Sequence, residues 1–204
     1  NGIIQGIDIN SDGVVDIEFY SPFSFPQPEL FTETEKQNIF DAYVKLSQFG
    51  GADSETVFSA IESSGGPLVL KSTSGPSNTP NLLNYEVLLN TLQPSISAYI
   101  DSDGIVRGLS LERLLIHETI HAVIGHEDIG NEDFFAANPD YMGDTVRLTN
   151  SIMAHPGLDE PERVSYFGGI SQNIFPVGTG LTDITFTGWD GSGTSFGQIN
   201  VANA

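Results

Sequence analysis

The 204-residue sequence contains no cysteine, which excludes disulfide bonds and any metal site built from thiolates. Positive charge is also scarce, because 7 Lys and Arg residues face 27 Asp and Glu residues, for a net charge of -20. A surface of this sign repels nucleic acid and anionic membranes, so we expect neither as a partner. No apolar run approaches the length that a membrane-spanning helix requires.

The chain begins at Asn1 instead of methionine and carries no signal peptide. We interpret it as a mature or excised fragment, and we expect a secreted or extracellular protein of bacterial origin. Its length and its apolar content of 39% fit one domain over residues 1–204. We expect an N-terminal lobe of about 1–125, a C-terminal lobe of about 126–204, and a monomer.

Alternating apolar residues predict strands, and residues such as Gly and Asn mark the turns between them. Thr32 and Glu35 form the pattern of a capping box, which predicts a helix that ends before Gly50. The segment 81–92 is ambiguous between helix and strand. Hairpins are expected at 3–20 and 96–107, a strand at 67–70, short helices at 54–61, 133–137 and 160–166, and short strands in 178–204. The pattern indicates an α+β fold.

The most informative stretch is His117-Glu118-Thr119-Ile120-His121, which reads H-E-x-x-H. Ser110 is a plausible N-cap and Gly125 a helix stop, so we expect a helix over about 111–124. Residues four apart share one helix face, and the two imidazoles can therefore reach one metal ion. Glu118 would then border the open position of the metal, where it can take a proton from a bound water.

This stretch and the later Ser151-Ile152-Met153-Ala154-His155-Pro156-Gly157 resemble the metzincin metallopeptidases, which have H-E-x-x-H-x-x-G-x-x-H and then a Met-turn. The helix expected from Thr32 resembles the first long helix of the serralysin and matrixin-like branch. The resemblance implies a twisted sheet, two long helices and an irregular C-terminal lobe. It also implies a zinc endopeptidase in which Met153 lies beneath the zinc ligands.

The glycine departs from the family pattern, because Gly125 stands one residue late. Counting from His117 puts the third ligand at Glu127, and counting from the glycine puts it at Asp128. Ligand chemistry favours His126, because a neutral imidazole suits zinc. The third ligand therefore stays open, with His126 preferred. Further candidates are His155 and, for a zinc hydrolase of another fold class, Glu132 or Glu160.

The implied reaction is hydrolysis of a protein or peptide substrate by a zinc-activated water, with Glu118 as the general base. His155 could touch the metal or the oxyanion, as a tyrosine two residues after the Met-turn methionine does in astacins and serralysins. Tyr141 and Tyr166 could also assist the oxyanion. The alternative function is a non-catalytic calcium- or zinc-binding module of a larger bacterial surface or adhesion protein.

An acidic turn near the N-terminus matches nine positions of an EF-hand-type calcium loop. Its candidate ligands are Asp8, Asn10, Asp12, the backbone carbonyl of Val14, and Asp16. Phe19 occupies the position of the final bidentate glutamate, so we expect weak calcium binding. A second, shorter turn of this kind is Asp101-Ser102-Asp103-Gly104.

Overall fold

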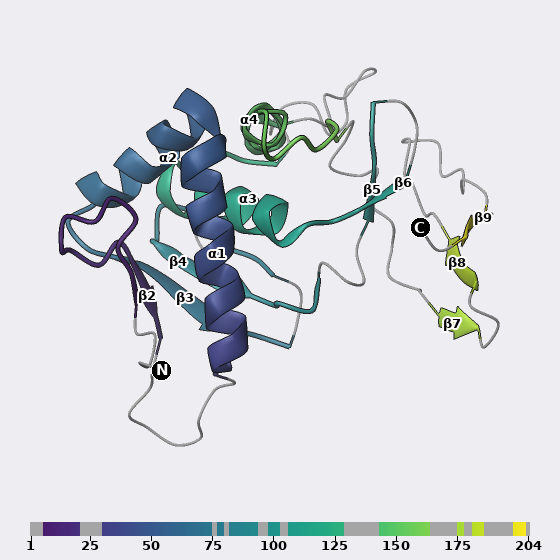
Figure 1. Ribbon diagram of the computed structural model, residues 1–204, viewed down its shortest axis with the longest axis horizontal. Coiled ribbons are helices and arrows are strands. Elements are labelled where there is room, and N and C mark those ends of the chain that lie inside the picture. The colour runs from purple at the N-terminus through teal and green to yellow at the C-terminus, as the bar shows by residue number, and fades with distance from the viewer. Residues whose placement is uncertain are drawn as a thin grey trace.

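The computed structural model describes residues 6–20, 30–74, 77–79, 82–93, 98–102, 106–128, 143–163, 175–177, 181–185 and 198–202. Four helices and three small sheets in these residues make an α+β fold, as the sequence pattern indicates. The helices pack around and beside a twisted sheet, and the strands that follow residue 174 lie at the opposite end of the molecule (Figure 1). None of the helices in the described ranges is long and apolar enough to cross a membrane.

The main sheet has the order β1-β2-β3-β4. Its strands are β1 (Gly6–Ile7), β2 (Ile17–Phe19), β3 (Leu68–Ser72) and β4 (Glu86–Leu89). The first two strands are antiparallel, with Ile7 opposite Ile17, which confirms the predicted hairpin in a shorter form. The pairs β2–β3 and β3–β4 are parallel. The ambiguous segment 81–92 therefore supplies a strand.

Helices α1 (Glu33–Phe49) and α2 (Gly51–Ser63) connect β2 to β3. The capping box at Thr32 is present in full, because its hydroxyl accepts from the Glu35 amide and the Glu35 carboxylate accepts from the Thr32 amide. Gly51 takes a φ of +66° at the junction of the two helices. A Cβ there would lie 2.2 Å from the ring of His155, so both the backbone angle and the space require glycine.

Helix α3 (Leu111–Val123) lies in the middle of the molecule, behind α1 and beside the sheet (Figure 1). Its bounds agree with the predicted helix, and the Ser110 hydroxyl caps it by accepting from the Arg113 amide. Every residue from Arg113 to Val123 is buried, although several are polar or charged. The Tyr43 hydroxyl of α1 and the Thr119 hydroxyl are 2.8 Å apart and bond each other inside the core. Polar groups buried in this way are retained when they have partners or a function.

Helix α4 (Asp144–Met153), which the sequence pattern did not predict, packs against α3. The antiparallel pair β5 (Ala98–Ile100) and β6 (Val106–Gly108) confirms the second predicted hairpin. Strands β7 (Phe175–Val177), β8 (Leu181–Thr185) and β9 (Gln198–Ala202) form a separate antiparallel sheet. The short helix expected at 160–166 is wrong for 160–163, which is irregular apart from a β-bridge between Arg163 and Asp101. The helix expected at 133–137 lies outside the described residues.

The buried guanidinium of Arg113 explains why 160–163 is not helical. It donates to the Glu160 carboxylate and to the Pro161 carbonyl, both at 2.9 Å, and stacks on the Tyr99 ring. The carboxamide of Asn150 on α4 completes the set, because its oxygen accepts from Arg113 and from the Arg163 amide. These bonds hold the segment against α3 and α4, and they occupy the Pro161 carbonyl and the Arg163 amide, which a helix would need for its own hydrogen bonds.

Candidate metal centre

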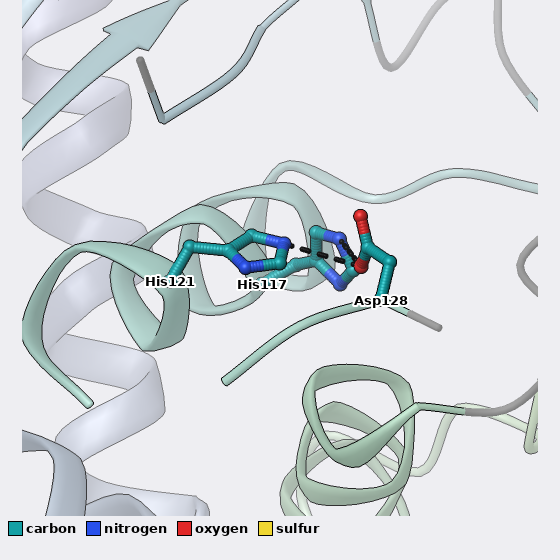
Figure 2. A group of neighbouring side chains, drawn as sticks. All are labelled: His117, His121 and Asp128. Atoms are coloured by element: carbon teal, nitrogen blue, oxygen red, sulfur yellow. Dashed lines mark hydrogen bonds and ion pairs between the residues drawn. The ribbon is translucent and has the colours of Figure 1, made fainter. Parts of the chain in front are cut away.

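Two histidines of α3 and one carboxylate beyond its end form the candidate metal centre (Figure 2). The Nε2 atom of His117 lies 3.0 Å from Oδ1 of Asp128, and the Nε2 atom of His121 lies 3.1 Å from the same oxygen. The two rings are 4.9 Å apart and nearly perpendicular, at 87°. One ligand atom from each residue lies within 4.8 Å of the others. This is the donor set that a catalytic zinc ion takes in proteins, namely three ligands of the N and O type.

The chain after α3 turns back so that Asp128 faces the helix that it has just left. Gly125 has a φ of +78°, and its amide bonds the Ile120 carbonyl, which ends the helix in a left-handed residue. The start of α4 then fixes the returning segment, because the Gly143 amide bonds the Asp128 carbonyl at 2.8 Å. The carboxylate is therefore positioned by backbone bonds on both sides.

His126 is preferred by the sequence reasoning, but its imidazole does not join the group. The residue contributes its backbone carbonyl instead, which accepts from Nδ1 of His121 at 2.6 Å. With that carbonyl turned toward His121, the His126 side chain points elsewhere, and its Nδ1 is buried with no partner among the described residues. Asp128, an alternative that the sequence left open, is the residue brought to His117 and His121.

The other candidate ligands lie in different surroundings. The ring of His155 packs against Gly51, at the junction of α1 and α2. The Glu160 carboxylate is paired with Arg113 at 2.9 Å. Met153 is buried in the core as the last residue of α4, so the expected Met-turn begins only after a helix. Glu132, Tyr141 and Tyr166 lie outside the described residues.

The charges of the centre act on one another through short contacts. Burial raises the pKa of Asp128, but hydrogen bonds from His117 and His121 outweigh this and hold that pKa well below its usual range. Burial lowers the pKa of His121, but the bond to Asp128 and its charge, the bond to the His126 carbonyl and the charge of Glu118 together outweigh burial, so the net shift is upward. Burial raises the pKa of Glu118, with the two histidines acting in the opposite direction.

Glu118 lines a cavity of about 270 Å³ together with His121 and Asp128. Thr79 holds Glu118 from the opposite segment, because its hydroxyl donates to the Glu118 carbonyl at 2.9 Å and lies 3.3 Å from the carboxylate. The cavity is lined on α3 and beyond by Glu118, His121, Glu127 and Asp128, and before β4 by Ser77, Asn78, Thr79 and Leu82. It is slightly smaller than the roughly 300–1,000 Å³ of small-molecule pockets and fits a short part of a chain.

Two threonines of α4 stand behind the histidines, on the side away from Asp128. The Thr145 hydroxyl lies 3.4 Å from Nδ1 of His121, and the Thr149 hydroxyl lies 3.4 Å from Nδ1 of His117. The threonines are four residues apart, so their spacing on α4 matches that of the histidines on α3. Such contacts to the far ring nitrogen fix the orientation of ligating histidines. Sequence reasoning missed both, because it missed the helix.

The carboxylates of the two acidic turns have other partners than histidines. In the first, Asp8 accepts from the amides of Asp12 and Gly13, and Asp16 accepts from the amide of Ile9 at 2.7 Å. In the second, the buried Asp101 carboxylate pairs with Arg107 at 2.7 Å. Asp103 and Gly104 lie outside the described residues. Calcium at the first turn stays a prediction.

The sequence matches no protein-family model, and no curated protein matches it. Among solved structures, the fold is similar to that of the Salmonella zinc metalloprotease effector GtgA, with a TM-score of 0.51. The likeness covers 68% of this chain and 74% of that chain at 17% sequence identity. At this identity it shows the fold, which is therefore similar to that of a zinc metalloprotease.

Proposed function

We propose that this protein is a zinc-dependent endopeptidase. The observation that carries the proposal is the convergence of His117 Nε2, His121 Nε2 and Asp128 Oδ1 within 4.8 Å. The general-base candidate Glu118 lines the adjoining cavity. The fold of a zinc metalloprotease supports the proposal independently of the motif.

The chemistry of the donor set fits zinc. Both histidines present Nε2 to the centre, and the Nδ1–H of His121 donates to the His126 carbonyl, which fixes the tautomer that a metal ligand needs. A zinc ion bound there would lower the pKa of a water molecule and polarise a substrate carbonyl. His117, His121 and Asp128 are the residues that would hold it, because two histidines and one carboxylate are a known ligand set of catalytic zinc sites.

Glu118 performs the proton transfers in this proposal. Its carboxylate is buried, and the raised pKa that burial causes makes it a stronger base than an ordinary glutamate. It accepts the proton of the attacking water and passes it to the leaving amine. Thr79 keeps the carboxylate directed at the cavity through its contacts with both the carbonyl and the side chain of Glu118.

We further propose that the enzyme is similar to the metzincins and that its substrate is a protein or peptide. We also propose that it acts outside the cell as a monomer. The H-E-x-x-H helix and the buried Met153 support the metzincin branch. The late position of Gly125 and the helix that runs up to Met153 depart from its pattern. An extracellular location rests on the sequence reasoning alone.

The test compares the protein with Glu118→Gln on an unfolded, casein-like substrate, with the zinc content of both measured by elemental analysis. We expect about one zinc per chain in each and a loss of about 10²–10⁴-fold or more in cleavage rate for the variant. Equal cleavage by both proteins would contradict the role of Glu118. Zinc without cleavage in either would favour the non-catalytic binding module.

A further inference from the structure

The cavity beside the metal ligands contains more negative charge than the proposed chemistry needs. Three of its lining residues are carboxylates, namely Glu118, Glu127 and Asp128. Glu118 is buried and held by Thr79, and Asp128 is occupied by the two histidines. Glu127 differs from both because it is exposed. Its carboxylate has no hydrogen bond or ion pair with any other residue that the structure describes.

No lysine or arginine side chain compensates this charge. All seven Lys and Arg residues lie within the described ranges, and none lines the cavity. Five of them pair with acidic side chains elsewhere on the molecule. The net charge of -20 adds a long-range field of the same sign. A zinc ion at the centre would offset two of the three carboxylate charges, and a ligand that enters the cavity would still meet the negative charge of Glu127.

The opposite side of the cavity carries no charge. Ser77, Asn78 and Thr79 supply neutral polar groups, and Leu82 supplies an apolar side chain that is 43% exposed. This contrast gives the cavity one charged side and one neutral side. A substrate that places a positive group toward Glu127 and its backbone toward the neutral side would match both.

We propose that Glu127 selects substrates with a lysine or arginine side chain next to the scissile bond. This inference rests on the proposed peptidase function and names the substrate class of the same site. Glu127 directly precedes Asp128 in the chain, so the basic side chain that it binds lies within one or two residues of the bond that is cut. A carboxylate paired with a substrate cation gives a charge-assisted bond, and it also disfavours acidic residues at that position.

The test begins with the cleavage sites of the wild-type protein in a mixture of unfolded proteins, mapped by mass spectrometry. A peptide around one site is then made in three forms, with Lys, Gln or Glu at the enriched position. We expect kcat/KM for the Lys form to exceed that for the Gln form by about tenfold, and the Glu form to be cut more slowly still. Added salt should reduce the preference for Lys.

Glu127→Gln should bring the Lys and Gln forms within about twofold of each other, and Glu127→Lys should reverse the order of the Lys and Glu forms. Both variants should keep their zinc, which separates substrate selection from metal binding. Glu55→Gln is the matched control, because Glu55 is an exposed glutamate of α2 that does not line the cavity. It should leave the preference unchanged.

An unchanged Lys preference in a zinc-loaded Glu127→Gln variant would overturn this inference and leave the peptidase proposal intact. So would cleavage sites with no enrichment of basic residues. Loss of zinc from Glu127→Gln would overturn it as well, by making Glu127 a metal ligand. A wild-type protein that binds zinc and cleaves no peptide would instead overturn the proposed function, and this inference with it.

Discussion

The two candidate cation sites differ in what their carboxylates do when no ion is bound. In the loop at 8–16, Asp8 accepts from two backbone amides of its own turn, and Asp16 accepts from the Ile9 amide. At the metal centre, Asp128 accepts instead from the Nε2 atoms of His117 and His121, which are themselves ligand atoms. The carboxylates of the loop are hydrogen-bonded by backbone amides. The Asp128 carboxylate is hydrogen-bonded by imidazole nitrogens that would bind a metal ion instead.

The difference follows from the local structure that carries each site. A turn leaves several amides free to point at a carboxylate, so the loop can hold its shape without an ion. The amides of α3 are used within the helix, so only side chains remain to balance Asp128. The stability of the metal centre should therefore depend strongly on zinc and on pH, and that of the loop weakly on either.

The largest expected effect is that of zinc on thermal stability. Zinc that binds only the folded protein adds about 2.7 kcal/mol at a hundredfold excess over Kd. We expect this gain at pH 8 and a much smaller one at pH 5.5, measured by thermal unfolding at fixed total zinc. Both imidazoles must be neutral to bind zinc, and the raised pKa of His121 means that affinity falls by more than about tenfold at the lower pH.

Without zinc, the contribution of the centre to the free energy of unfolding should be larger at pH 5.5 than at pH 8. The raised pKa of His121 contributes stability that is fully present below its unfolded value, about 6.5, and that is lost as pH rises through the folded pKa. The lowered pKa of Asp128 contributes stability above its own unfolded value, about 3.9, so this term is constant from pH 5.5 to 8. A zinc gain of equal size at both pH values would contradict this picture of the centre.

A smaller effect is expected when the loop loses one of its own acceptors. Asp8→Ala removes the acceptor of the Gly13 amide and one of the two acceptors of the Asp12 amide, which keeps the Asn10 side chain, and it should lower the free energy of unfolding by about 1 kcal/mol. Asp41→Ala is the control, because Asp41 is exposed on α1 and accepts from the Gln37 side chain. It should cost less than about 0.5 kcal/mol. Equal losses from both variants would show that the loop does not depend on its carboxylates.

The smallest expected effect is that of calcium. Glu62 of α2 accepts from the Asn10 side chain, and its charge contributes to the raised pKa of Asp16 after the larger effect of burial. A fourth carboxylate thus approaches the loop from outside the turn. At about five times a millimolar Kd, calcium should add roughly 1 kcal/mol, and Asp12→Ala should remove most of it. A melting temperature that responds equally to magnesium would show that the effect is not specific to calcium.

The elements that sequence reasoning predicted are those fixed by local signals. The capping box at Thr32 determines the start of α1, and Ser110 and Gly125 delimit the helix that carries the histidines. The hairpins follow from alternating residues around tight turns. Each of these signals lies within a few residues of the structure that it specifies.

Helix α4 has no comparable signal at its start. Its N-cap, Gly143, makes no side-chain cap, and its buried face includes the polar Thr145, Thr149 and Asn150. The helix is amphipathic, with Val146, Ile152 and Met153 buried on the same face, but the interpretation of 151–157 as a Met-turn assigns its last residues to a loop. Its buried polar side chains contact His121, His117 and Arg113 of α3, and only the tertiary structure shows these partners.

The third member of the metal centre could be narrowed but not chosen from the sequence. His126, Glu127 and Asp128 are consecutive, and all can bind zinc. Their directions depend on the left-handed turn at Gly125 and on the bond between the Gly143 amide and the Asp128 carbonyl. Thr79 was also out of reach, because it meets Glu118 only through tertiary structure, 39 residues apart.

The most direct test of the metal centre is the zinc affinity of Asp128→Ala beside that of His126→Ala, measured by competition with a chelator at pH 8. Asp128→Ala should weaken zinc binding by at least about 100-fold, because it removes a direct ligand, and His126→Ala should change it by less than about tenfold. His126 keeps its backbone carbonyl in the alanine variant, so the support of His121 remains. A larger loss in His126→Ala than in Asp128→Ala would contradict the assignment of Asp128 to the centre.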